Sequence, residues 1–214
     1  MLLFLVFFII IAMLWNEGCW SNILTMINVL LAAMIATNYF EPMATWIEGF
    51  SDGMLSYTYL WDFLSLWGLF FLAYGILRTF TDQLSKTRVR FKMPVEHGGR
   101  VFFAGWAAWI FVSFASMSLH VAPLAAVPLR GSFAETPDDS VFFGFALDRH
   151  WLALMQSRSR HALSHKGGSD ASDHPDDNER LVFDPHSEFI FRYHSRRETL
   201  EQHNNETGRI RISP

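Results

Sequence analysis

The chain has 214 residues, of which half are apolar, and its formal net charge is −4. Its basic residues form no broad patch, which argues against a nucleic-acid-binding protein, and the single cysteine excludes an intramolecular disulfide. The apolar residues are concentrated in the first half. Residues 1–77 contain no lysine or arginine, whereas residues 164–214 are rich in charged, histidine and amide side chains. This distribution predicts an all-α integral membrane protein with a polar tail.

The first two predicted membrane spans form a hairpin with almost no loop, and we expect them to pack as antiparallel neighbours. Residues 1–15 are uncharged, with no basic residue before the apolar stretch and no small-residue cleavage site after it, so they predict a short first span rather than a cleaved signal peptide. Residues 22–40 predict the second span, which Pro42 should end. Ala32 and Ala36 lie four residues apart, so they predict a face on which another helix can approach closely.

The third and fourth predicted spans follow a linker of mixed character. Residues 41–58 have apolar side chains at helical spacing between acidic ones, which predicts a short amphipathic helix on the membrane surface. Residues 58–77 predict the third span, because about 20 apolar residues match the hydrocarbon thickness of a bilayer. Residues 101–119 carry no charge and predict the fourth span, with Gly98 and Gly99 relieving crowding at its start.

The connection between the third and fourth spans predicts the orientation of the protein. It carries six basic residues, whereas the first two connections carry none. Basic loops stay in the cytoplasm, which puts residues 41–58 outside and, with four spans, both termini outside. The loop can also contact anionic lipid head groups or a cytoplasmic partner. The six residues are Arg78, Lys86, Arg88, Arg90, Lys92 and Arg100.

The second half of the chain predicts an extracytoplasmic extension. Residues 141–163 are amphipathic, with Trp151, Leu152 and Met155 on one face, and predict a helix lying on the membrane surface. The predicted organisation has three parts: a four-helix membrane domain over residues 1–120, an extracytoplasmic amphipathic segment over 121–163, and a polar, largely disordered tail over 164–214 with one short helix within 181–201.

Two polar residues inside the predicted spans are candidates for a function. Asp62 is the only acid well inside an apolar run, so it can be a proton or ion site or an interfacial structural residue, and no span offers it an opposing lysine or arginine. Asn28 lies in the second span, where a helix–helix hydrogen bond is commoner than a ligand contact.

The sequence predicts no enzyme, no cofactor and no metal site. Residues Gly49 to Gly53 match the G-x-S-x-G pattern around Ser51, but a nucleophile elbow needs a strand before the serine and a helix after it, so a turn is the better interpretation. His161 and His165 lie near several tail acids, yet a metal site needs three or four ligands in fixed geometry.

A known family shows a similar arrangement over about residues 1–120. The chain has a tight first hairpin, the linker sequence W-I-E-G-F at residues 46–50, and a basic loop that ends in Gly98-Gly99 before a span with small residues. In this it resembles the colicin V production proteins of the bacterial inner membrane. The resemblance implies an integral membrane protein linked to colicin V production or export, without an established catalytic residue. In some relatives a similar helical module anchors a periplasmic domain.

The sequence therefore predicts a membrane scaffold or accessory protein, involved in toxin or bacteriocin production or export or in envelope maintenance. The alternative is a small transporter or channel subunit. The spans offer only Asn28, Ser65 and Asp62 as a polar path, so this alternative requires an oligomer. The expected partners are the lipid bilayer, a membrane or periplasmic protein, and further copies of the chain, but no nucleic acid.

Overall fold

The computed structural model describes residues 2–49, 58–85, 92–122, 145–159, 183–184, 187–196, 199 and 202. This part of the chain contains helices and connecting turns and no strand, so the all-α prediction is confirmed for it. The helices are α1 (Leu2–Leu14), α2 (Cys19–Glu48), α3 (Thr58–Leu84), α4 (Val95–Val121) and α5 (Leu147–Ser159). Residues 189–196 form a further short helix, here called the C-terminal helix.

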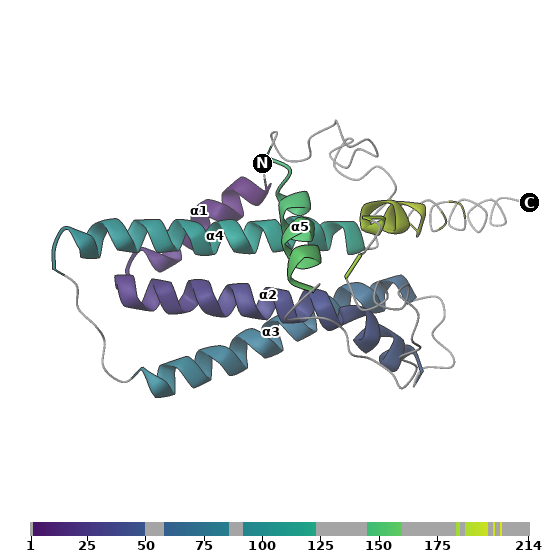
Figure 1. Ribbon diagram of the computed structural model, residues 1–214, viewed down its shortest axis with the longest axis horizontal. Coiled ribbons are helices and arrows are strands. Elements are labelled where there is room, and N and C mark those ends of the chain that lie inside the picture. Colours follow the sequence, from purple (N-terminus) through teal and green to yellow (C-terminus); the bar gives the residue numbers. More distant parts are fainter. Residues whose placement is uncertain are drawn as a thin grey trace, which may run out of the picture.

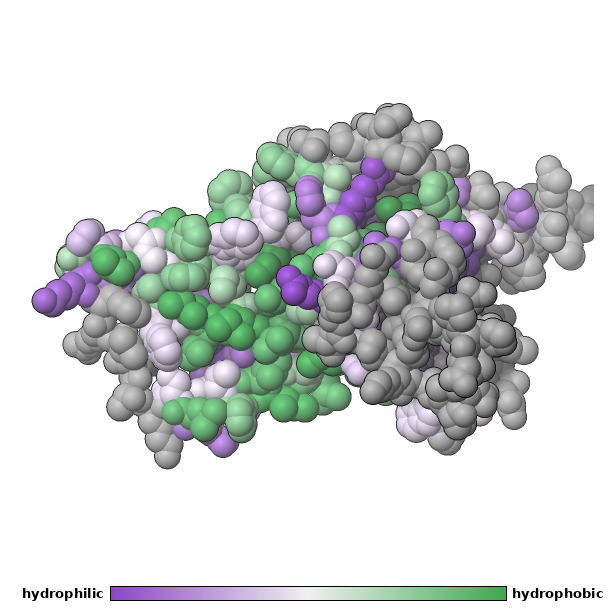
Figure 2. Space-filling model, viewed as in Figure 1, coloured by the Kyte–Doolittle hydropathy of each residue, from purple (hydrophilic) through white to green (hydrophobic). Residues whose placement is uncertain are grey.

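Three of these helices, α2, α3 and α4, are long and apolar enough to cross a membrane. Figure 2 shows hydrophobic side chains over much of the face where they lie together. The predicted first span corresponds to α1, whose 13 residues extend about 20 Å, less than the roughly 30 Å of a bilayer's hydrocarbon core. The described residues therefore contain three candidate spans and one shorter apolar helix.

The three long helices lie side by side with α2 between α3 and α4; α2 and α4 begin at the same end of the bundle, and α3 runs in the opposite direction (Figure 1). Small residues allow this packing, since Ala32, Ala33 and Ala36 of α2 are all 0% exposed. The prediction that the first two spans pack on each other is wrong, because α1 packs mainly against α4. Leu14 of α1 lies beside Ala104 of α4.

Two predicted helix boundaries differ from the structure. Pro42 does not end α2, which continues to Glu48 and includes part of the expected surface helix over 41–58. Proline lacks an N–H and crowds the preceding turn, so it can bend a helix without ending it. In Figure 1 the last turns of α2 bend away from the axis of the preceding turns. Similarly, α4 begins at Val95, before Gly98 and Gly99. Residues 50–57, which include Ser51, lie outside the described residues.

The two neighbouring glycines of α4 have different surroundings. A Cβ atom at Gly99 would lie 2.5 Å from the sulfur of Cys19, the first residue of α2. A Cβ atom at Gly98 would meet no atom within 4 Å. The missing side chain at Gly99 therefore lets the beginnings of α2 and α4 come together.

Replacing Gly99 by alanine is expected to lower the free energy of unfolding by about 1–3 kcal/mol, because the new methyl group would overlap with Cys19. Thermal unfolding in mild detergent measures the effect. The matched control is Gly98→Ala, which should be neutral or stabilise by up to about 1 kcal/mol through helix propensity. Adding Cys19→Ala to Gly99→Ala should restore stability, and equal melting temperatures for the two glycine variants would contradict the prediction.

Helix α5 crosses the bundle instead of extending it (Figure 1). Trp151 is 2% exposed and Met155 is fully buried, and both belong to the hydrophobic core that contains Ala32 and Phe114. The opposite face of α5 exposes His150 and other residues. The apolar face predicted to lie on the membrane surface is therefore packed on α4 and α2 and is part of the protein core.

The C-terminal helix packs on the same core and falls within the predicted range 181–201. Phe189 and Tyr193 are buried, with each ring centroid 6.5 Å from that of Phe40 in α2. The described part of the tail is thus ordered against the end of the bundle. The predicted disorder of the remaining tail residues, 164–182, 185–186, 197–198, 200–201 and 203–214, concerns positions outside the described residues.

Candidate functional site

Polar side chains gather at the two ends of the helix bundle. The basic-end cluster lies where α2 and α4 begin and α3 ends, and the acidic-end cluster lies where α2 ends and α3 begins. The basic-end cluster comprises Glu17, Thr25, Asn28, Arg78, Thr81 and Asp82. The acidic-end cluster comprises Glu41, Asp62, Arg192, Tyr193 and Arg196.

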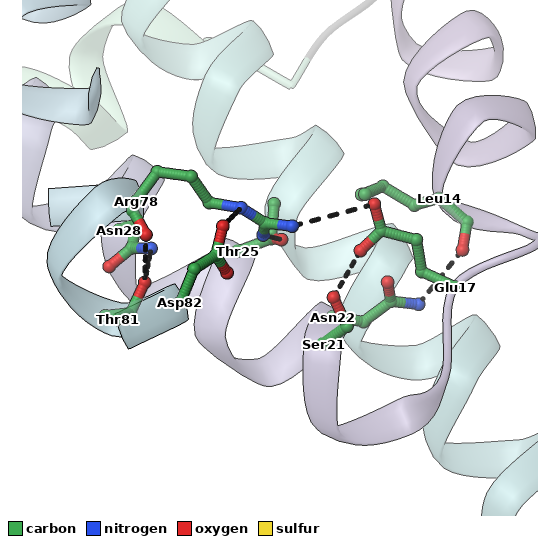
Figure 3. Close-up of polar contacts among 9 residues, drawn as sticks. All are labelled: Leu14, Glu17, Ser21, Asn22, Thr25, Asn28, Arg78, Thr81 and Asp82. Carbon is green, nitrogen blue, oxygen red and sulfur yellow. Dashed lines mark hydrogen bonds and ion pairs between the residues drawn. The ribbon is translucent and has the colours of Figure 1, made fainter. Parts of the chain in front are cut away.

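Arg78 is the centre of the basic-end cluster (Figure 3). Its guanidinium donates a hydrogen bond of 2.9 Å to the hydroxyl of Thr25 in α2 and one of 3.1 Å to the carboxylate of Asp82. A third nitrogen lies 3.9 Å from a carboxylate oxygen of Glu17, in the turn before α2. Arg78 therefore ties α3 to α2 and to the turn that precedes it.

Asn28 makes a helix–helix hydrogen bond beside this arginine. Its side chain is 1% exposed, and its amide nitrogen donates to the Thr81 hydroxyl of α3 at 2.9 Å (Figure 3). Thr81 in turn donates to the backbone carbonyl of Arg78 at 3.0 Å. The contacts of Asn28 are therefore with its own chain and serve to hold α2 and α3 together.

Further polar contacts join the beginning of α4 to this end. The buried amide of Asn22 donates to the backbone carbonyls of Leu14 and Arg100, at 3.3 and 3.0 Å. The backbone N–H of Cys19 donates to a carboxylate oxygen of Glu96, 3.7 Å from the Arg100 guanidinium. These bonds join α1 and α4 to the beginning of α2, at the same end of the bundle where Arg78 joins α3 to α2.

The six basic residues predicted to set the orientation are not equivalent. Arg78 and Arg100 are held by partners within the bundle, as described above. Lys92 is exposed. Lys86, Arg88 and Arg90 lie outside the described residues.

Asp62 is the centre of the acidic-end cluster. It is 7% exposed, and a carboxylate oxygen lies 2.5 Å from the Arg196 guanidinium of the C-terminal helix. The Tyr193 hydroxyl lies 3.4 Å from a carboxylate oxygen of Asp62 and 3.4 Å from one of Glu41. Arg192 forms an ion pair with Glu41. The cation opposite Asp62 comes from the tail and not from a span.

The surroundings of the Tyr193 hydroxyl favour its protonated form, which can donate a hydrogen bond. Burial raises the pKa of its hydroxyl, and the carboxylates of Glu41 and Asp62 raise it further. The phenol therefore stays protonated at neutral pH. The guanidinium carbons of Arg196 and Arg192 lie 4.9 and 5.4 Å from the centre of its ring, within cation–π range.

Sequence reasoning singled out Asp62 but missed the residues that contact it. Arg192 and Arg196 are four residues apart, as are Phe189 and Tyr193, so both pairs recur at helical spacing. This pattern could have identified an amphipathic basic helix over 189–196. It could not have shown that the helix binds beside Asp62, which lies 134 positions before Arg196.

A buried pair and an indole hydrogen bond hold α5 to the bundle. His120 of α4 and Asp148 of α5 are 2.8 Å apart, with side chains 1% and 0% exposed. Burial by itself would raise the pKa of Asp148, but the hydrogen bond and charge of His120, together with the backbone N–H and charge of Arg149, outweigh it and hold that pKa below its ordinary value. The Trp151 indole nitrogen donates to the Thr37 hydroxyl of α2 at 3.1 Å.

A hollow of about 280 Å³ lies between α5 and the C-terminal helix. Its polar side chains are already used in folding. The Asp184 carboxylate accepts the backbone N–H groups of Glu188 and Phe189, at 2.8 and 3.2 Å, and so caps the C-terminal helix. Gln156 of α5 donates to the Asp184 carbonyl at 2.9 Å. We therefore assign this hollow no ligand.

Within the described ranges, no three histidine, cysteine or acidic side chains come together in a way that could hold a metal ion. The other residues weighed for chemistry, Ser51, His161 and His165, lie outside those ranges. The two polar clusters are therefore the candidate sites, and their geometry joins helices through paired charges.

Comparisons of this chain with protein-family models, with curated proteins and with solved structures find no match. The resemblance to the colicin V production proteins thus rests on the arrangement of residues 1–120 alone.

Proposed function

We propose that this chain is a multi-pass membrane scaffold or accessory protein of the bacterial inner membrane. Its role, as in the colicin V production proteins that it resembles, is in toxin or bacteriocin production or export or in envelope maintenance. One observation carries the proposal: the charged groups at both ends of three long apolar helices pair with one another instead of lining a path between the helices.

The interior of the bundle supports a scaffold over a single-chain transporter. Between the clusters, the space between α2, α3 and α4 is filled by fully buried side chains such as Ala36, Leu66 and Phe114. A transport path needs ionisable or other polar groups along the middle of the membrane. Of the three candidates in the described helices, Asn28 and Asp62 lie towards opposite ends and are bonded within the chain. The third, Ser65, is 4% exposed and lies three residues after Asp62, so it belongs to the same end.

The proposed orientation puts the basic-end cluster and residues 86–91 in the cytoplasm. Helix α4 then ends outside, which places α5 and the C-terminal helix on the extracytoplasmic side. We include α1 as a short fourth crossing, since it runs back toward the acidic end and packs Leu3 beside Ala115 and Leu147. Both termini are then extracytoplasmic, and the segment after α4 is available to a periplasmic partner.

Cysteine accessibility tests this orientation. In a Cys19→Ser background, single cysteines at Ser51, Ser85 and Ser187 are treated in intact cells with a membrane-impermeant thiol reagent. We expect labelling at positions 51 and 187 and none at 85 until the cells are opened. Labelling at position 85 alone would show that the protein has the opposite orientation. Labelling at 51 but not at 187 would contradict the proposed number of crossings after residue 58.

Two experiments test the scaffold role itself. The purified chain in proteoliposomes should release no entrapped ions or small dyes above the rate of empty liposomes. Deletion of the gene in its native host should lower toxin export or envelope integrity, and return of the intact gene should restore them. Solute flux that depends on Asp62 would favour the oligomeric transporter instead, and absence of any reproducible partner after cross-linking would count against a scaffold.

A further inference from the structure

The C-terminal helix bridges two of the long helices through one face. Arg192 and Arg196, four residues apart, bind the carboxylates of Glu41 in α2 and Asp62 in α3. Between them, Tyr193 contacts both carboxylates through its hydroxyl. One short helix thus neutralises two acids that belong to different helices.

The surface beneath this helix is complementary to a basic amphipathic helix. We call it the acidic receptor surface and define it as Phe40, Glu41 and Asp62. Phe40 is fully buried, and the rings of Phe189 and Tyr193 lie over it. Residues 1–77 contain no lysine or arginine, so the cation for these acids has to come from elsewhere in the chain or from another molecule.

The C-terminal helix depends on this contact for its own structure. Its described helical residues are 189–196, 199 and 202, and an isolated helix shorter than about 12–15 residues is marginal in water. Its ion pairs remain reachable from solvent, because the side chains of Arg192 and Arg196 are 46% and 38% exposed. The preceding residues stay attached to α5, where Phe183 N–H donates to the Ser159 hydroxyl. Release of the helix therefore needs no movement of α5.

We propose that the C-terminal helix is an autoinhibitory strap, which occupies the acidic receptor surface that a basic, aromatic-containing helix of a partner protein binds. The inference rests on the proposed scaffold function and deepens it by giving the partner's chemistry: two arginines four residues apart, flanked by aromatic side chains. In the closed state Asp62 is paired within the chain. In the open state the partner's arginines replace Arg192 and Arg196.

The test measures strap opening in the full chain. In a Cys19→Ser background, spin labels at Thr45 and Ser195, both exposed, report the distance between the end of α2 and the strap. The probe for the partner is a synthetic peptide with the sequence of residues 187–199, SEFIFRYHSRRET. The control peptide has glutamate in place of all three arginines, so it keeps the aromatic residues and reverses the charge that matters.

We expect a single short distance without peptide and a second, longer population when the basic peptide is in excess. The control peptide should leave the distance unchanged. The variant Arg192→Glu/Arg196→Glu should open without peptide and bind the basic peptide about tenfold more tightly than the parent chain, because no closed state competes. Combining it with Glu41→Arg/Asp62→Arg should close the strap again.

A reversed-charge variant that keeps the short distance would overturn the proposal, and so would one that opens without binding the basic peptide. If that variant fails to fold, judged by its thermal unfolding, the milder Arg196→Gln serves in its place and should give a partial opening. Failure of the proposed scaffold role would show separately as solute flux in proteoliposomes, a measurement that does not depend on the state of the strap.

Discussion

Replacing Asp148 by alanine is expected to destabilise the protein by about 3–5 kcal/mol, because it removes one partner of a buried pair. The carboxylate and the imidazole of His120 are 2.8 Å apart, and neither side chain is reached by solvent. In this variant the buried imidazole of His120 no longer has the Asp148 carboxylate beside it at the junction of α4 and α5. Thermal unfolding in mild detergent, with the parent chain alongside, measures the loss.

The matched controls separate this pair from general effects on α5. His150→Ala changes an exposed residue on the same helix and should alter stability by less than about 0.5 kcal/mol. The double variant His120→Leu/Asp148→Leu removes both polar groups, and should be much more stable than the sum of its single variants predicts. Additive losses in the double variant would show that the pair is not energetically coupled.

The same pair predicts how stability depends on acid. The folded-state pKa of Asp148 lies below its ordinary value of 3.8. A depressed carboxyl pKa contributes stability that is fully present above the ordinary value and is lost as the pH falls through the folded value. We therefore expect a fall in melting temperature below about pH 4 that the double leucine variant lacks. An identical acid profile in both proteins would contradict this.

Local patterns were sufficient for the helical class and for three long apolar helices. An apolar run of about 20 residues predicts a span wherever it occurs, because the bilayer fixes the length required. The close packing of another helix on the face that contains Ala32 and Ala36 could also be predicted, because it follows from the four-residue spacing of small side chains. Boundaries were predicted less well: Pro42 and Gly98 are typical of helix ends, but Pro42 lies inside the last turns of α2 and Gly98 inside the first turn of α4.

For each candidate site, the sequence identified one residue of a contact but not the residue that it contacts. Asp62 stands out because a carboxylate in an apolar run is unusual, but its partner Arg196 lies in a polar tail with many other charges. Trp151 could be assigned to an apolar face of a helix, yet its hydrogen bond to Thr37 joins residues 114 positions apart. Which surfaces meet across such distances depends on the shape of the assembled core, and single-sequence patterns report only on neighbours along the chain.

Truncating Trp151 to alanine is expected to have an effect as large as loss of Asp148, about 3–5 kcal/mol. The indole is 2% exposed, and its ring centroid lies 6.0 Å from that of Phe114 in α4. Its N–H also donates to the Thr37 hydroxyl at 3.1 Å. Trp106→Ala is the control, because that indole is 49% exposed on the outside of α4 and should cost far less.

Two further variants divide the Trp151 effect into its parts. Trp151→Phe keeps most of the packing and loses the hydrogen bond, whereas Thr37→Val keeps the shape and leaves the indole N–H without its acceptor, at an expected cost of about 1–3 kcal/mol. Equal losses for Trp151→Phe and Trp151→Ala would assign the whole effect to the hydrogen bond.

Loss of Trp151 should also open the strap, although this residue touches neither Arg192 nor Arg196. The strap begins at residues fixed to α5, where Gln156 donates to the carbonyl of Asp184 at 2.9 Å. When α5 leaves the bundle, the strap loses that attachment and must be held by its own ion pairs and two aromatic rings. The spin-label distance between Thr45 and Ser195 should therefore broaden in Trp151→Ala but not in Trp106→Ala. A closed strap in Trp151→Ala would show that the acidic receptor surface alone holds the C-terminal helix.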